Sequence, residues 1–348
     1  MEDSNTLKNS MLYVTFNQDA SCFAVGTETG FRIYSSYPYK DSFTREMGGG
    51  IGIIEMLNRS NVLALVGGGQ NPKYDQKKVI IWDDHRAKVI SELSFISIVK
   101  NVKLKRDKLF VICEQKIYIF GFISFENIEN LETYDNPKGI VAISTDPSKT
   151  IVAYLDKLVG SVKVRDLDNG SEITIPAHEN NIACLSLNTI GTLLATCSER
   201  GTLIRVFDTK SGNKLKELRR GTEKAEIYSL VFDATSKFLA CSSDRKTIHI
   251  FSLNDDVEDN AEKEEPKNHK SVMAKFATFL GFQKTYFNSE WSYAKFRVDD
   301  IKTICAFGPE NTIIAVSSEG NYYQGIFDSK VGGECMKVQE KNIFKSDK

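Results

Sequence analysis

The order of apolar and polar residues along this chain repeats. Each copy has a polar turn, a run rich in Val, Ile, Tyr, Phe and Thr, a short turn, and a second run that ends in apolar or aromatic residues. Short runs of this composition, bounded by Gly, Asn, Asp and Ser, predict pairs of β-strands. The pattern occurs seven times, at residues 22–34, 62–82, 108–120, 150–164, 192–207, 237–251 and 311–327.

The spacing of these copies indicates the architecture. Their ends lie roughly 40–45 residues apart, which is the period of four-stranded propeller blades. The copies at 192–207 and 237–251 are nearly superposable, and the one long step, from 251 to 327, contains an insertion. The Trp-Asp signature occurs once, at Trp82-Asp83, so the chain is a degenerate relative of the WD-repeat class.

These observations predict an all-β chain that folds as a seven-bladed β-propeller of four-stranded antiparallel blades, with a long insertion in the sixth blade. The single propeller domain is expected at residues 11–335, the insertion at 254–290, and a C-terminal tail at 336–348. Residues 13–16, ahead of the first copy, are expected to complete the last blade and close the ring.

Composition narrows the possible functions. The 348 residues include 45 Lys and Arg and 46 Asp and Glu, and this net charge of −1 argues against nucleic-acid binding, which needs a strongly basic face. No signal peptide and no run of 18 apolar residues is found, so we expect a protein that is neither secreted nor membrane-spanning. Seven cysteines without a Cys-x-x-Cys spacing favour a reduced, cytoplasmic compartment.

Residues suited to catalysis or metal binding are scarce. The four histidines form no His-Glu-x-x-His motif and no Cys/His cluster. The glycine runs at 48–52 and 67–69 match neither a P-loop nor a dinucleotide fingerprint, and they are typical of turns with positive φ. No nucleophile has an adjacent base, so we expect no enzyme activity, no cofactor and no metal.

Two adjacent arginines, Arg219 and Arg220, follow a predicted strand at 214–218. Because side chains alternate along a strand, the two are expected to point to opposite sides of the sheet. A guanidinium presents a rigid fork of donors that suits phosphate oxygens. The pair therefore indicates two phosphate sites that flank one strand. The alternative is a solvated arginine pair at a strand end.

Hydroxyl and imidazole side chains accompany these arginines in the fifth and sixth copies. The first set comprises His178, Ser198, Thr202, Arg205 and Arg219. The second set comprises Arg220, Ser242, Ser243, Thr247 and His249. Each set offers hydroxyls, an imidazole and a guanidinium, which suit an inositol phosphate. The alternative is structural: the first histidine caps a blade, as in many WD-type repeats, and the Ser and Thr residues hold turns together.

The chain resembles the PROPPINs, seven-bladed β-propellers that bind phosphoinositides, from about residue 11 to residue 330. The strongest marks are Leu218-Arg219-Arg220-Gly221 and the stretch that runs from Ala177-His178 to 204–208. Segments 48–57, 63–69 and 79–84 are similar to the branch of the human WIPI-three and WIPI-four type.

This resemblance implies binding of phosphatidylinositol 3-phosphate and phosphatidylinositol 3,5-bisphosphate, and a role in autophagy. The two residue sets above would be phosphoinositide sites one and two. The protein would be a cytoplasmic monomer that associates reversibly with autophagic or endosomal membranes and binds autophagy proteins on its propeller face. Family members often have Lys-Gly where this chain has Arg245-Lys246, so the hairpin of site two departs from the pattern.

The insertion combines an acidic run at 255–265 with an apolar face. The residues expected to enter a membrane are Val272, Met273, Phe276, Phe279, Leu280 and Phe282. Four of them follow the i, i+4, i+7, i+8 spacing of a helical face, and lysines lie nearby. The alternatives are a helix packed on the propeller and a helix that binds a partner. In PROPPINs a hydrophobic loop of this blade inserts beside the lipid sites, so the resemblance favours the membrane.

The competing interpretation of the whole chain is a protein-interaction scaffold. Its arginines would then bind an acidic or phosphorylated protein partner without recognising lipid. The two interpretations separate on one test, because a scaffold should ignore lipid headgroups.

Overall fold

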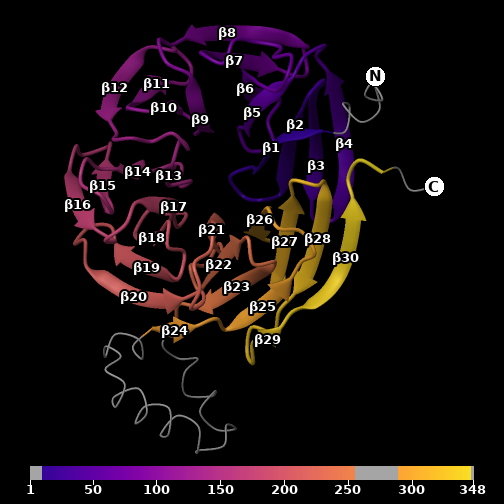
Figure 1. Ribbon diagram of the computed structural model, residues 1–348. Helices are drawn as coiled ribbons and strands as arrows, with labels where there is room; N and C mark the ends of the chain where they lie inside the picture. Colours follow the sequence, from indigo (N-terminus) through magenta and orange to yellow (C-terminus); the bar gives the residue numbers. More distant parts are fainter. Residues whose placement is uncertain (1–9, 255–288, 346–348) are drawn as a thin grey trace, which may run out of the picture.

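The computed structural model describes residues 10–254 and 289–345. Within these residues the strands form seven sheets, arranged as blades around a central axis, and no helix is present (Figure 1). Each blade contains four antiparallel strands, which follow the sequence from the axis outward (Figure 1). The predicted seven-bladed β-propeller is therefore confirmed.

The first four blades have no irregular additions. Blade one contains β1 (Met11–Phe16), β2 (Cys22–Thr27), β3 (Gly30–Ser36) and β4 (Tyr39–Glu46). Blade two contains β5 (Ile51–Met56), β6 (Val62–Gly67), β7 (Lys78–Asp83) and β8 (Lys88–Ser94). Blade three contains β9 (Val99–Leu104), β10 (Lys108–Cys113), β11 (Lys116–Gly121) and β12 (Asn127–Glu132). Blade four contains β13 (Val141–Ile143), β14 (Ile151–Leu155), β15 (Ser161–Asp166) and β16 (Glu172–Pro176).

Blades five and six each gain a two-residue parallel strand at the outer edge. Blade five contains β17 (Ile182–Leu187), β18 (Leu193–Ser198), β19 (Leu203–Asp208) and β20 (Lys214–Arg219), with β24 (Glu290–Trp291) added. Blade six contains β21 (Ile227–Phe232), β22 (Phe238–Ser243), β23 (Thr247–Ser252) and β25 (Ala294–Arg297), with β29 (Gly333–Glu334) added. Blade seven contains β26 (Thr303–Phe307), β27 (Thr312–Ser317), β28 (Asn321–Ile326) and β30 (Met336–Asn342).

The middle strands explain why the repeat is visible in the sequence. β6, β10, β18 and β22 are buried along nearly their whole length. A strand that is covered on both faces by neighbouring blades must be apolar at successive positions, so it reads as a continuous hydrophobic run. The outer strands β4 and β8 are mostly exposed and leave a much weaker signal.

Apolar side chains fill the spaces between neighbouring blades. The described residues form seven such clusters, one at each junction between two blades. The cluster between blades five and six includes Ile204 and Leu218 from the first and Leu230 and Phe251 from the second. The hydrophobic effect therefore holds each blade against both of its neighbours around the ring.

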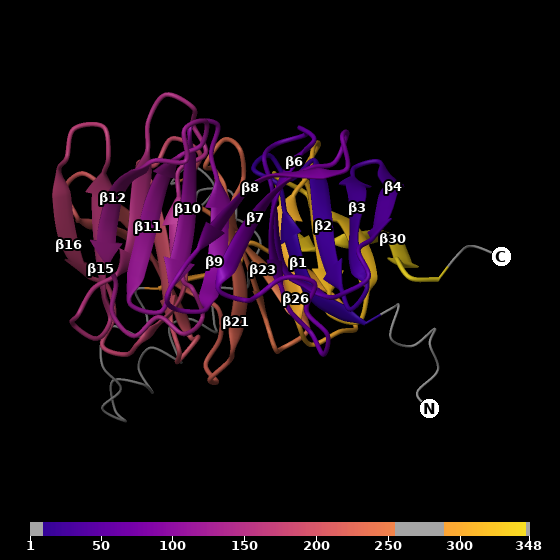
Figure 2. The same ribbon diagram turned by 90° about the horizontal axis from the view of Figure 1, so that it is seen from above.

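The ring closes in a way that the sequence did not predict. The expectation that residues 13–16 complete the last blade is wrong, because β1 pairs with β2 in blade one. The fourth strand of blade seven is β30, so residues 336–342 belong to the propeller and not to a tail, and the domain extends past residue 335. Blades one and seven lie side by side (Figure 1, Figure 2) and join through packed side chains: Tyr322 donates a hydrogen bond to the carbonyl of Ser36 at 2.7 Å.

The long insertion follows β23 and precedes β25, both in blade six. Most of the predicted segment at 254–290, including every residue expected to enter a membrane, lies outside the described residues. The returning chain is described from Ser289, and β24 pairs in parallel with the end of β20. Within the described part of the chain, no helix has the length and apolarity that a membrane crossing would require.

Candidate functional site

The arginine pair lies at the end of β20, and both side chains are buried, with relative exposures of 7% for Arg219 and 5% for Arg220. Leu218 packs into the core between blades five and six. Since side chains alternate along a strand, Arg219 lies on the side of blade four. Arg220 lies toward blade six, where it electrostatically lowers the pKa of His249. The pair thus reaches both grooves beside blade five.

Arg219 is joined to the returning end of the insertion. Its Nε donates a hydrogen bond to Ser289 Oγ at 2.8 Å, and Trp291 is its backbone partner in the short strand β24. Beside them, Lys216 Nζ lies 3.1 Å from a Glu290 carboxylate oxygen. The insertion of blade six therefore ends against the arginine of site one. Sequence reasoning missed Ser289, because no local pattern relates it to β20.

On the blade-four side, a hydrogen-bond network fixes His178. Its Nε2 lies 2.9 Å from Thr196 Oγ1. Arg205 donates to the carbonyl of Ala177 at 2.7 Å and to a carboxylate oxygen of Glu217 at 2.9 Å. Arg205 therefore has an internal carboxylate partner and positions the loop that carries His178. This network agrees with the blade-capping interpretation of the histidine. Thr196, two residues before Ser198 on the same side of β18, was missed.

The hairpin between β18 and β19 holds Arg220 through hydrogen bonds to its backbone and side chain. The carbonyl of Thr202 accepts the N–H of Arg220 at 3.0 Å, and Ser198 is buried where the hairpin begins. The carbonyl of Gly201 accepts Arg220 Nε at 2.8 Å, and the carbonyl of Glu223 accepts a second guanidinium nitrogen. Among the described residues, Arg220 therefore bonds to backbone carbonyls and to no carboxylate.

In the groove between blades five and six, Arg220 meets the second residue set. Ser243 and His249 are nearly fully buried, and the Nδ1 atom of His249 has no hydrogen-bond partner within the described chain. Thr247 is half-buried at the start of β23. A buried imidazole nitrogen without a partner is destabilising unless a ligand or water satisfies it. This atom therefore marks a place for a donor or acceptor from a ligand.

Ser242 does not belong to this groove. Its neighbour Cys241 packs toward blade five, so Ser242 points to the other side of β22. There its hydroxyl donates to the carbonyl of Thr303 in blade seven at 2.7 Å and lies 2.8 Å from Ser229 Oγ. Its assignment to site two is therefore withdrawn, and its role is to join blades six and seven.

Both site histidines are neutral at physiological pH. Burial, together with the nearby Arg205, lowers the pKa of His178 to about 4. Burial also lowers the pKa of His249 to about 4, with Arg220 and Lys295 acting in the same direction. Neutral imidazoles can both donate and accept hydrogen bonds, so neither repels the arginine beside it.

We predict that acid destabilises this protein through these histidines. An unfolded histidine protonates near pH 6.5, whereas the folded ones do so near pH 4. Their contribution to stability is complete above the unfolded pKa and is lost as pH falls from 6.5 toward 4. The free energy of unfolding should fall by roughly 1 kcal/mol per pH unit and per histidine in that window. Urea unfolding at several pH values would measure it. A His249→Gln variant with an unchanged slope would contradict the assignment for that residue.

The hairpin of site two contains a strained residue. Lys246 has φ of +55°, a left-handed conformation that favours glycine. In the corresponding hairpin of blade five, Gly201 takes φ of +63°. The chain therefore keeps a left-handed turn conformation at this hairpin although it has lysine where blade five has glycine.

Replacing Lys246 with glycine should stabilise the protein by about 0.5–1 kcal/mol, because the left-handed conformation then carries no steric penalty. Urea unfolding would measure the difference. Lys246→Ala is the matched control: it removes the charge but keeps the Cβ atom, so it should give no gain. Equal stabilities of the glycine and alanine variants would show that the turn is not strained.

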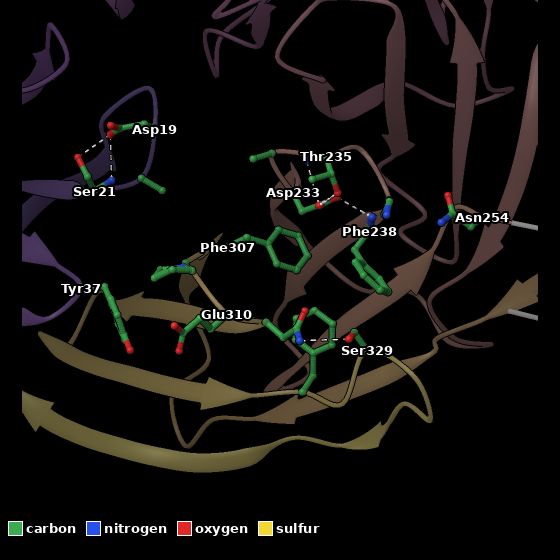
Figure 3. A pocket seen from close by; sticks show the side chains of 17 residues that line it. Asp19, Ser21, Tyr37, Asp233, Thr235, Phe238, Asn254, Phe307, Glu310 and Ser329 are labelled. Atoms are coloured by element: carbon green, nitrogen blue, oxygen red, sulfur yellow. Dashed lines mark hydrogen bonds between the residues drawn. The ribbon is translucent and has the colours of Figure 1, made fainter. Parts of the chain in front are cut away.

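A separate cavity of about 760 Å³ lies among loops of blades one, six and seven (Figure 3). Two of its three acidic lining residues hold turns together. Asp233 accepts the backbone N–H of Phe238, and Asp19 accepts the hydroxyl of Ser21 (Figure 3). Carboxylates repel phosphate, so this cavity does not fit the ligand expected at the arginines.

Comparison with known proteins decides the family. The family model described as PROPPIN matches residues 10–344, which is nearly the whole chain. The chain belongs to the PROPPIN family. The resemblance drawn from Leu218-Arg219-Arg220-Gly221 and the surrounding repeats is thereby confirmed.

Relatives of this PROPPIN carry names from autophagy. It is 37% identical to Autophagy-related protein 18e of Arabidopsis thaliana, over 96% of this chain and 88% of the relative. It is 31% identical to Autophagy-related protein 18 of Dictyostelium discoideum, over 99% and 96%. Among solved structures, Kluyveromyces lactis Hsv2 superposes with a TM-score of 0.76 at 26% identity, over 96% and 99%. KlAtg21, solved in complex with the coiled coil of AgAtg16, shares the fold, with a TM-score of 0.74 at 24% identity over 96% and 99%.

Proposed function

We propose that this PROPPIN binds membranes that contain phosphatidylinositol 3-phosphate or phosphatidylinositol 3,5-bisphosphate, through two sites that flank Arg219 and Arg220. The observation that carries the proposal is the state of Arg220. Its guanidinium is buried, yet within the described residues it bonds only to carbonyls. The carboxylates of Asp244 and Glu223 act on this guanidinium electrostatically but accept no hydrogen bond from it among the described residues, and burial lowers its pKa. A phosphate oxygen would supply both a directly paired negative charge and an acceptor.

Each site would offer four side chains to a headgroup. Site one would offer Arg219, Ser198, Thr202 and the imidazole of His178 to a headgroup phosphate. Its fifth member, Arg205, contributes by holding the histidine loop, since Glu217 already neutralises it.

Site two would combine Arg220 with the hydroxyls of Ser243 and Thr247 and with the unpartnered Nδ1 of His249. Both sites lie beside one strand, so a single membrane surface could occupy them together. When one site holds a headgroup, the other site stays near the membrane, so the effective concentration of lipid at that second site rises. Two weak contacts together would therefore give tight but reversible recruitment.

The apolar face predicted at residues 272–282 would add a shallow membrane contact. It lies outside the described residues, so its support is the sequence pattern and the family. The described base of the insertion, from Ser289 to Trp291, lies beside Arg219 of site one. This attachment would place the insertion near a bound headgroup.

The protein would act as a binding protein and not as an enzyme. As a monomer in the cytoplasm, it would recruit autophagy proteins to autophagic or endosomal membranes through its propeller face, and it would not bind nucleic acid. The names of its relatives support the setting, and the coiled-coil complex of KlAtg21 supports a protein partner for this fold.

Titration with a water-soluble short-chain phosphatidylinositol 3-phosphate tests the proposal. We expect two equivalents per chain by calorimetry, and one equivalent in each of the variants Arg219→Thr and Arg220→Thr, because each removes one guanidinium. Absence of binding by the wild-type protein would favour the scaffold that binds acidic or phosphorylated partners.

A further inference from the structure

In each blade a hairpin joins the second and third strands, and the hairpin of blade four differs from the others in the exposure of its apolar residues. Their tips are the residues between those strands: 28–29, 68–77, 114–115, 156–160, 199–202, 244–246 and 318–320. Large apolar side chains are strongly exposed in one tip only, that of blade four, where Leu158 is 68% and Val159 is 60% exposed. Since equivalent tips tolerate polar residues, the fold does not require this apolar pair.

The apolar tip is fixed to the loop of site one. The carbonyl of Gly160 accepts the N–H groups of Ala177 at 3.0 Å and His178 at 2.9 Å. Gly160 has φ of +73°, and a Cβ atom there would lie 1.8 Å from the carbonyl oxygen of His178. Only glycine permits this close approach. The tip is therefore a rigid extension of the site-one loop, and Leu158 and Val159 are held beside His178.

The tips of the next two blades carry exposed basic residues. Arg200 is exposed in blade five, and Arg245 and Lys246 are exposed in blade six. Equivalent hairpins lie at the same end of their blades, so an apolar tip and two tips with exposed basic residues follow one another along the side that holds both arginine sites. Glu199 leaves the tip of blade five without net charge, whereas the tip of blade six keeps a net charge of +1 beside Asp244. Arg245 lies 3.3 Å from a carboxylate oxygen of Glu223 and 3.8 Å from one of Asp244.

We propose that Leu158 and Val159 insert into the lipid interface beside site one, as an apolar contact separate from residues 272–282. This inference rests on the proposed function, because a headgroup in site one would bring the tip to the membrane. A lipid surface fits better than a protein partner. Two side chains on one turn suffice for shallow insertion beside basic residues, whereas a stable protein interface buries roughly 800 Å² per partner.

The first test replaces both residues with serine. We expect Leu158→Ser/Val159→Ser to bind phosphatidylcholine vesicles containing phosphatidylinositol 3-phosphate roughly tenfold more weakly, because it loses the apolar transfer into the interface. Binding of the soluble short-chain lipid should be unchanged. Ile123→Ser is the matched control, since Ile123 is 90% exposed in the hairpin between the third and fourth strands of blade three, at the opposite end of the blades. It should bind vesicles like the wild type.

The second test measures insertion directly. The chain has two tryptophans, Trp82 and Trp291, so Leu158→Trp in a background with both replaced by Phe gives a single fluorescent reporter. We expect a blue shift on vesicle binding and quenching by lipids brominated near the interface. Vesicle binding without quenching, together with full affinity of the serine variant, would overturn the inference. Failure of the wild-type protein to bind the soluble lipid would instead overturn the proposed function, and the inference with it.

Discussion

Replacing both arginines, as Arg219→Thr/Arg220→Thr, should weaken binding to vesicles containing phosphatidylinositol 3-phosphate by roughly hundredfold or more. A hydrogen bond to a charged group contributes about 1.5–3 kcal/mol, and the double variant loses such bonds at both sites. The two guanidiniums lie on opposite sides of β20, so neither can replace the other. Co-sedimentation with vesicles that contain or lack the 3-phosphorylated lipid would measure the loss.

Arg86→Thr provides the control for this experiment. Arg86 lies in blade two, and its side chain is 65% exposed beside Asp83, so its loss removes one positive charge far from the two sites. This variant should bind vesicles like the wild type. If the double variant retained its lipid-dependent binding, the arginines would not be the headgroup ligands, and the scaffold interpretation would gain support.

Gly201→Ala should destabilise the protein by about 2–5 kcal/mol, the largest effect that we expect from a single substitution in the site. Gly201 has φ of +63°, and a Cβ atom there would lie 2.0 Å from the carbonyl oxygen of Ala225. The hairpin must shift to avoid this contact, and the carbonyl that accepts Arg220 Nε would shift with it. Urea unfolding and calorimetric titration should therefore both show a loss, the latter at site two.

A second glycine, Gly221 of the Leu218-Arg219-Arg220-Gly221 motif, separates this effect from a general intolerance of alanine. Nothing lies within 4 Å of the position that a Cβ atom would occupy on Gly221. Gly221→Ala should therefore change the free energy of unfolding by less than about 1 kcal/mol. Equal losses for both variants would contradict the steric explanation.

The blades could be predicted because their middle strands are enclosed. β18 and β22 are covered by neighbouring blades on both faces, which requires apolar residues at successive positions and makes the two copies nearly superposable. The outermost strand β30 has no such requirement, because it is largely exposed. Its polar sequence resembles a tail, and for this reason the ring closure was predicted wrongly.

In the candidate site, too, some features follow from the local sequence and others only from the tertiary structure. Alternation along β20 is a local property, so the sequence alone placed Arg219 and Arg220 on opposite sides. The same rule applied to β22 would have separated Ser242 from Ser243, which the shared motif had grouped together. The pairing of Arg205 with Glu217 joins two neighbouring strands, and only their register reveals it.

What the sequence by itself determined was the number of blades, the insertion in the sixth and the arginine pair between two grooves, because local periodicity encodes each of them. The tertiary structure decided which side chains remain available to a ligand. Arg205 is neutralised by Glu217, Arg219 contacts Ser289 across 70 residues of sequence, and Arg220 donates its hydrogen bonds only to carbonyls among the described residues. These differences arise because the stability of a buried charge depends on its partners, and the fold brings those partners from distant segments of the chain.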